Sequence, residues 1–148
     1  WNVEFLQTRN MLAQVFLQMN KIFVRMKPLY HYRIRQGSIV HMNSFNDHSC
    51  DEIQIADLCC DYLARHGYRN QNALNYFRLQ GRADVLFNIF QSDAPHEVYR
   101  RIARDMRRHL WPVLHDGTVP VSRKIKHTLL SLAPLSYHKL QQVVGDRS

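Results

Sequence analysis

The sequence predicts a mainly α-helical chain with a small α+β remnant at its start: an N-terminal helix plus a β-hairpin, followed by a helical C-terminal region. Apolar residues recur at helical spacing before residue 20 and again after residue 48. Two short β-like runs lie between these regions, on either side of a Lys-Pro pair. With 148 residues, 45% of them hydrophobic, the chain is long enough to bury a core.

The first part, residues 1–42, is expected to hold one helix and one hairpin. Strands are predicted at 22–24 and 29–32, because Pro28 breaks a helix and favours an extended approach. A two-stranded hairpin is marginal by itself, so it should pack on the helices, pair with another chain to form an oligomer through its edge, or belong to a sheet whose other strands lie upstream. An amphipathic helix is predicted from Val3 to Met19, on the spacing of Phe5, Leu12, Val15, Phe16 and Met19.

The second part, residues 43–148, begins with a polar loop and continues with three predicted helices before the Trp111-Pro112 pair. The first is expected to end near Gly67 and the second near Ser92, and the third follows Pro95. The residues expected on their core faces are Ile53, Ala56, Cys60, Leu63 and Ala64; then Leu74, Phe77, Gly81, Val85 and Ile89; then Val98, Ile102, Met106 and Leu110.

Two short amphipathic pieces, Ser122 to Leu132 and Leu135 to Val144, are expected to close the chain. Their cationic and apolar side chains alternate at helical spacing. This pattern suits either an interfacial helix on anionic lipid or simple docking onto neighbouring helices. The residues concerned are Arg123, Lys124, Lys126 and Lys139, with Ile125, Leu129, Leu130, Leu132, Leu135 and Leu140.

Charge and cysteine content point to a compartment and a class of partner. Lys and Arg number 20 and Asp and Glu 12, which gives a formal net charge of +8 and favours a phosphate-bearing partner. Three cysteines, two of them adjacent, favour a reducing compartment. The expected location is cytoplasmic, with peripheral contact on the inner face of the membrane as the alternative. Because the sequence opens at Trp1 without a Met, we expect the natural start to lie upstream.

The segment from Tyr30 to His41 carries residue types that bind anions. Arginine makes bidentate bonds to phosphate, Gly37 lets the backbone approach closely, and serine and histidine add short donors. The alternative is a solvated basic loop after a hairpin. The side chains proposed to bind a substrate here are Arg33, Arg35, Ser38 and His41.

Residues 28–39 read Pro-Leu-Tyr-His-Tyr-Arg-Ile-Arg-Gln-Gly-Ser-Ile, and this stretch resembles the end of the catalytic domain in bacterial family-2 glycosyltransferases of the GT-A fold. The resemblance covers about residues 3 to 42. It implies that residues 1–42 are the terminal part of a GT-A-like domain and that the whole enzyme transfers a sugar from a nucleotide-diphosphate sugar to a glycan acceptor in polysaccharide biosynthesis. It further implies that Arg33, Arg35 and Ser38 face the donor diphosphate, with His41 near the diphosphate or a divalent metal, Mg or Mn.

Two departures from the family pattern indicate that this chain alone is not catalytic. The Asp-x-Asp metal motif of the family is absent, as are the nucleotide-binding βα units that precede it. In the family an acidic dipeptide that supplies the general base stands where this chain has Trp1-Asn2, and the amide of Asn2 cannot accept a proton at neutral pH.

The alternative function is a non-enzymatic basic helical module that binds nucleic acid or a protein partner. It rests on the arginine-rich helix from Glu97 to His109, since a basic stripe is the footprint of phosphate contacts. No finger, RNP-like strand or helix-turn-helix accompanies the stripe, so nucleic acid is not the expected partner. His48, Cys50, Cys59 and Cys60 lack metal-ligand spacing, and the cysteines are expected to be buried, inert thiols. No nucleophile elbow, Walker loop or carboxylate pair is present.

Overall fold

The structure is a computed structural model, and it describes residues 14–15, 17–19, 21, 45–46, 48–90 and 92–145. Within these residues five helices follow one another along the chain. They are α2 (Asp51–Arg65), α3 (Gln71–Ile89), α4 (His96–His115), α5 (Val121–Leu132) and α6 (Pro134–Gly145).

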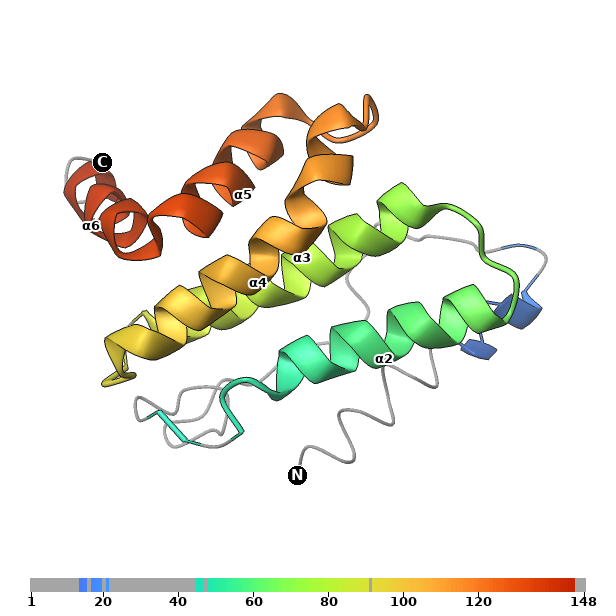
Figure 1. The fold of residues 1–148 in the computed structure, drawn as a ribbon, viewed down its shortest axis with the longest axis horizontal. Helices are drawn as coiled ribbons and strands as arrows, with labels where there is room; N and C mark the ends of the chain where they lie inside the picture. Colours follow the sequence, from blue (N-terminus) through green and yellow to red (C-terminus); the bar gives the residue numbers. More distant parts are fainter. Residues whose placement is uncertain are drawn as a thin grey trace, which may run out of the picture.

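Helices α2, α3 and α4 run up and down beside one another, and α3 packs against both of the others (Figure 1). Helix α5 turns back along α4, and α6 contacts both α5 and α4. Among the described residues, no helix has the length and apolar character needed to cross a bilayer.

The predicted fold class is wrong in one respect. The described residues form helices and connecting turns with no strand, so the architecture they show is all-α, without the α+β remnant. Both segments predicted as strands, 22–24 and 29–32, lie outside the described residues, and so does most of the helix predicted from Val3 to Met19. Of that helix, residues 14, 15, 17 and 18 are helical and Met19 is not.

The predicted helices after residue 48 are confirmed, with one shift of a boundary. Gly67 follows α2 with φ of 90°, the left-handed conformation that glycine adopts without strain. Asn70 caps α3 by accepting a hydrogen bond from the Ala73 backbone N–H at 3.1 Å. Helix α4 continues through the expected stop at Pro112 to His115. A proline so near the end removes one backbone hydrogen bond only, and the fully buried Val113 keeps the last turn on the core.

The core lies where α3 meets its neighbours. Leu79, Ala83 and Leu86 of α3 are completely buried, as are Met106 of α4 and Leu130 of α5. The predicted core position of Met106 is confirmed, but the three buried residues of α3 were not predicted. Phe77, which was predicted to face the core, is 43% exposed. Ala64, also expected on a core face, is exposed too.

Close packing of α2 on α3 depends on a small residue. A Cβ atom at Gly81 would meet the Cβ of Ala56 at 2.8 Å, a distance that real Cβ contacts do not show. Both residues are buried. The absence of a side chain at Gly81 therefore sets how closely the two helices approach.

One arginine joins three helices inside the bundle. Arg82 of α3 is 3% exposed, and its two terminal nitrogens donate to the carboxylate of Asp57 on α2 at 2.9 and 3.0 Å. Its Nε donates to Asp105 of α4 at 2.5 Å. Burial acts to lower the pKa of this guanidinium, but the hydrogen bonds and charges of the two carboxylates outweigh it and raise the pKa. Arg82 is therefore charged and fully engaged.

We predict that Arg82→Met lowers the free energy of unfolding by about 3–5 kcal/mol, because it takes from Asp57 and Asp105 the buried cation that joins them and leaves each with one more distant arginine. Urea denaturation followed by circular dichroism measures the change. Arg108→Met is the matched control. Its side chain is 76% exposed and pairs with the same Asp105 at 3.4 Å, so we expect a loss below about 1 kcal/mol. Equal losses in the two variants would contradict the role given to Arg82.

A buried histidine on α5 lacks hydrogen bonds. His127 is 0% exposed, its ring lies edge-on to that of Tyr76 at 5.7 Å, and neither ring nitrogen has a hydrogen-bond partner within the described part of the chain. Burial, with the nearby charges of Lys126 and Arg123, lowers its pKa from 6.5 to about 4. The folded state thus holds this imidazole neutral.

We predict that stability falls with acidity between the two pKa values of His127. The unfolded chain binds a proton near pH 6.5 and the folded chain only near pH 4, so folding is favoured above this window and loses up to about 3 kcal/mol across it. Unfolding free energies of wild type and His127→Leu at pH 8 and pH 4.5 test this. The variant should lose less stability on acidification than the wild type. An identical loss in the two proteins would refute the assignment.

Candidate functional site

The site residues predicted from the sequence are not brought together by the described part of the structure. Asn2, Arg33, Arg35, Ser38 and His41 all lie outside the described residues. The described chain resumes at Phe45, four positions after His41. What the structure does show is where the chain enters the helical bundle.

Phe45 fixes this entry point. Its backbone N–H donates to Oδ1 of Asp93 at 2.9 Å, in the turn between α3 and α4, and its side chain packs against the core. A second anchor follows, because Ser49 Oγ accepts a hydrogen bond from the Asn46 N–H at 3.0 Å. The start of α2 therefore lies beside the start of α4, although the two are 45 residues apart in sequence.

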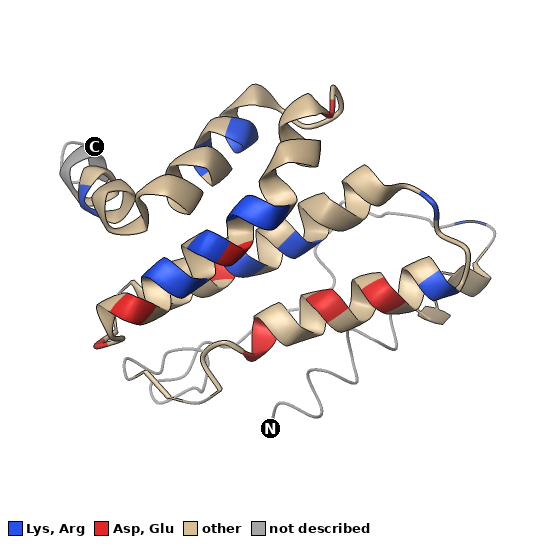
Figure 2. Ribbon diagram, in the orientation of Figure 1, with Lys and Arg blue, Asp and Glu red and all other residues tan. Residues whose placement is uncertain are grey.

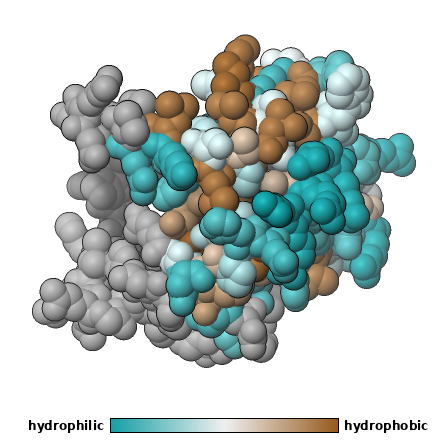
Figure 3. All heavy atoms as spheres, turned by 60° about the vertical axis from the view of Figure 1, so that its left-hand side comes forward, coloured by the Kyte–Doolittle hydropathy of each residue, from teal (hydrophilic) through white to brown (hydrophobic). Residues whose placement is uncertain are grey.

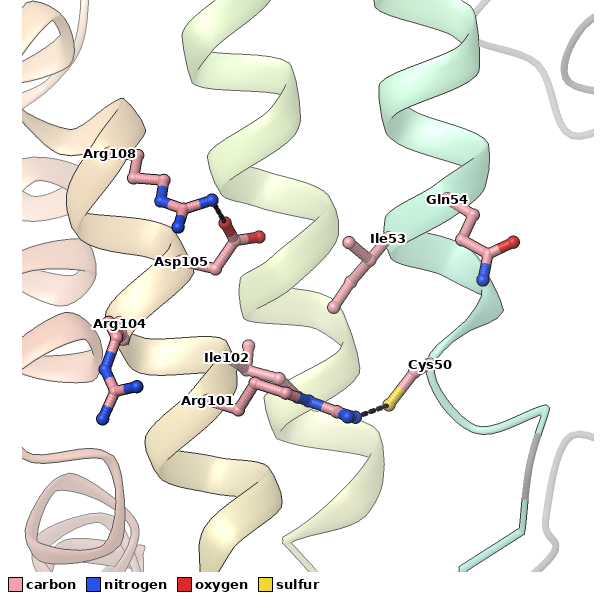
Figure 4. Close-up of a pocket in the computed structure, with 8 residues that line it drawn as sticks. All are labelled: Cys50, Ile53, Gln54, Arg101, Ile102, Arg104, Asp105 and Arg108. Atoms are coloured by element: carbon pink, nitrogen blue, oxygen red, sulfur yellow. Dashed lines mark hydrogen bonds and ion pairs between the residues drawn. The ribbon is translucent and has the colours of Figure 1, made fainter.

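A groove of about 450 Å³ opens between the start of α2 and the middle of α4 (Figure 4). On the α2 side it is bounded by Cys50, which precedes the helix, and by Ile53 and Gln54. On the α4 side the lining residues are Arg101, Ile102, Arg104, Asp105 and Arg108. Two isoleucines form an apolar floor, and polar groups surround it.

The charge in the groove is positive. Three arginines line the groove against one carboxylate, that of Asp105, which is already bound by Arg82 and by Arg108. Arg101 extends across the groove, with Nη2 at 4.0 Å from the Cys50 sulfur (Figure 4). Within the described residues, neither Arg101 nor Arg104 makes an ion pair with a carboxylate. An anion entering the groove would find these two cations available.

The basic stripe predicted on the third helix is confirmed as a surface feature of α4. Arg100, Arg101, Arg104, Arg107 and Arg108 are all exposed, and Figure 2 shows the cations along this helix. The opposite side of α4 carries the buried Ile102 and Met106. Arg107 differs from the rest, because its Nε donates to the Ser131 carbonyl oxygen at 3.0 Å and so joins α4 to α5.

Two of the three cysteines are buried, as the sequence predicts. Cys59 and Cys60 are buried, and Cys60 donates to the Leu74 carbonyl oxygen at 3.4 Å. Burial raises the pKa of the Cys60 thiol to about 11, so it is not a thiolate at neutral pH. Cys50 is half-buried and lines the groove. In the part of the chain that the structure describes, no three His, Cys, Asp or Glu side chains gather to hold a metal ion.

Two features of this region were missed in the sequence analysis. The first is the partnership of α4 with the start of α2, which brings Gln54 to the arginines; no spacing in the sequence relates segments so far apart. The second is the burial of Arg82. A signal for it exists, since Arg78 and Arg82 stand one turn apart on α3 while Asp57 and Asp61 stand one turn apart on α2.

Comparisons with known proteins do not identify a family. No protein-family model matches the chain, and neither the curated proteins nor the solved structures contain a match.

We predict that the groove binds a small polyvalent anion weakly. Inorganic pyrophosphate should raise the thermal midpoint of the chain at low ionic strength, and Arg101→Gln/Arg104→Gln should weaken its binding about tenfold, since each lost guanidinium removes a charge-assisted hydrogen bond. Titration calorimetry measures the affinity. The control, Arg100→Gln/Arg123→Gln, removes the same charge from exposed sites that do not line the groove. Equal weakening by both double variants would show attraction to net charge alone.

Proposed function

We propose that the chain is the C-terminal part of a family-2 glycosyltransferase, in which residues 33–41 bind the donor diphosphate and the helical region supports them. The proposal rests on the Pro28 to Ile39 pattern, which resembles that family. The substrate of the complete enzyme is a nucleotide-diphosphate sugar and the acceptor is a glycan. A divalent metal, Mg or Mn, is the expected cofactor of the complete enzyme.

The helical region supports this proposal through its entry point. From His41 to Phe45 an extended chain spans at most about 14 Å. Phe45 is itself held by Asp93 in the turn before α4, and Cys50, five residues after Phe45, lines the groove together with Arg101 and Arg104. The segment proposed to bind the diphosphate is thus tethered to the part of the bundle that carries unpaired cations.

The chemistry explains why cations are needed there. In sugar transfer the acceptor hydroxyl attacks the anomeric carbon as the bond to the diphosphate breaks, and negative charge grows on the leaving group. Fixed guanidinium groups stabilise that charge more in the transition state than in the bound donor. The general base must come from another residue than Asn2, because an amide does not accept the hydroxyl proton.

A second candidate function is a basic binding module without catalytic activity, and one observation favours it. All five arginines in the middle of α4 are exposed, and they form one cationic surface. A mobility-shift assay on mixed-sequence DNA and RNA at physiological salt tests this candidate. We expect no tight complex, and a sub-micromolar affinity that depends on Arg100 and Arg104 would favour the module over the transferase.

We predict that in the full-length enzyme Arg35→Ala reduces kcat/KM by about 30- to 1000-fold, the effect of losing one charge-assisted contact in a closed site. Arg33→Ala should also reduce it. Transfer from a labelled nucleotide sugar measures the rates, with circular dichroism as the folding check. Arg100→Ala, on the exposed surface of α4, is the matched control and should leave the rate within a few-fold of wild type. Wild-type kinetics in both loop variants would assign residues 33–41 to a solvated loop.

A further inference from the structure

An uninterrupted apolar stripe runs along the outer side of α5. Val121, Ile125, Leu129 and Leu132 are 69, 55, 39 and 63% exposed. At 3.6 residues per turn, these four side chains project within about 80° of one another around the helix axis. Figure 3 shows hydrophobic atoms exposed near the top of the molecule, among pale and hydrophilic ones.

The stripe is not the side by which α5 packs on the bundle. His127, Leu130 and Ser131 face inward and are completely buried, and Arg107 of α4 binds the Ser131 carbonyl oxygen. The inner side of α5 makes the contacts that hold the helix on the bundle. The outer side of such a surface helix usually carries polar residues. Four large apolar residues there are therefore not explained by the fold.

The charge around the stripe is of one sign. The sequence from Val121 to Gly145, which covers both α5 and α6, contains no Asp or Glu. It contains Arg123, Lys124, Lys126 and Lys139. Lys124 and Thr128 border one side of the stripe by helical position, and Lys126 borders the other. Leu140 of α6 adds a further exposed apolar side chain, at 56%.

We propose that α5 is a membrane-docking helix, which lies flat on an anionic lipid surface with Val121, Ile125, Leu129 and Leu132 inserted among the acyl chains. An apolar stripe bordered by cations, with no carboxylate to be repelled, is the pattern of an interfacial helix. The structure corrects the sequence analysis on one residue, because Leu130 belongs to the core and not to the inserted side. This proposal stands independently of sugar transfer.

A second copy of the chain is a poorer occupant. A two-fold contact through the stripe would bring the cations that border it, Lys124 among them, close to those of the other copy, and like charges at a contact weaken it. An acidic protein would satisfy the charge as a lipid surface does. Failure of the chain to bind anionic vesicles would leave an acidic protein as the occupant.

Flotation of the 148-residue chain with vesicles tests the proposal. We expect it to float with vesicles of phosphatidylcholine and phosphatidylserine, not with phosphatidylcholine alone, and to be released by salt. Ile125→Ser/Leu129→Ser should lower the partition coefficient at least about tenfold, because both side chains leave the acyl region. Lys124→Gln should lower it about fivefold on anionic vesicles, because it removes one bordering charge worth roughly 1 kcal/mol.

The matched control is Leu58→Ser/Phe77→Ser. These two side chains, on α2 and α3, are 50 and 43% exposed and lie outside the stripe. The control should float like the wild type, and all variants should keep the helical signal and thermal midpoint. Two results would overturn the proposal: equal flotation of wild type and Ile125→Ser/Leu129→Ser, or a concentration-dependent dimer in sedimentation that this variant abolishes without any effect of lipid.

Discussion

The ion network centred on Arg82 is the constraint on which the bundle depends. A guanidinium that is 3% exposed must have partners, and it finds them on two different helices, Asp57 of α2 and Asp105 of α4. This fixes the rotation of α2 and α4 about their axes relative to α3, since a turn of either helix would remove its carboxylate from reach. Hydrophobic burial supplies the driving force for packing, but it tolerates small rotations that a bidentate pair does not.

The network also shapes the groove on the surface. Asp105 is the single carboxylate among its lining residues, and Arg82 already binds it from within. The negative charge at this point of the surface is thereby largely compensated, and the exposed arginines of α4 set the local potential. The same charges act on the half-buried His109. Burial lowers its pKa most and the charge of Arg82 lowers it further, while Asp105 has a smaller, opposite effect.

Periodicity in the sequence predicted most of the helices but fewer of the residues that form their core. Val98, Ile102, Met106 and Leu110 mark the inner side of α4 correctly, because one amphipathic helix against one core follows a simple pattern. Helix α3 is central and contacts neighbours on several sides, so its apolar stripe is broad, and Leu79, Ala83 and Leu86 were missed while Phe77 was wrongly placed inside. Nothing in the described residues tests the predicted substrate loop, and the groove depends on a meeting of α2 and α4 that no local pattern encodes.

The cations behind the net charge of +8 have different roles at different positions, and only the structure distinguishes these roles. Arg82 is paired with carboxylates inside the core, and Arg107 donates to a carbonyl oxygen between two helices. The Nζ of Lys126 lies over the ring of Phe87, 4.4 Å from its centre. In the described part of the chain, two surfaces combine cations with exposed or accessible apolar residues. One is the groove on α4, where cations surround a small apolar floor and suit a compact anion. The other is α5, where cations border an extended apolar stripe and suit a lipid surface, because a soluble anion would gain nothing from the exposed leucines.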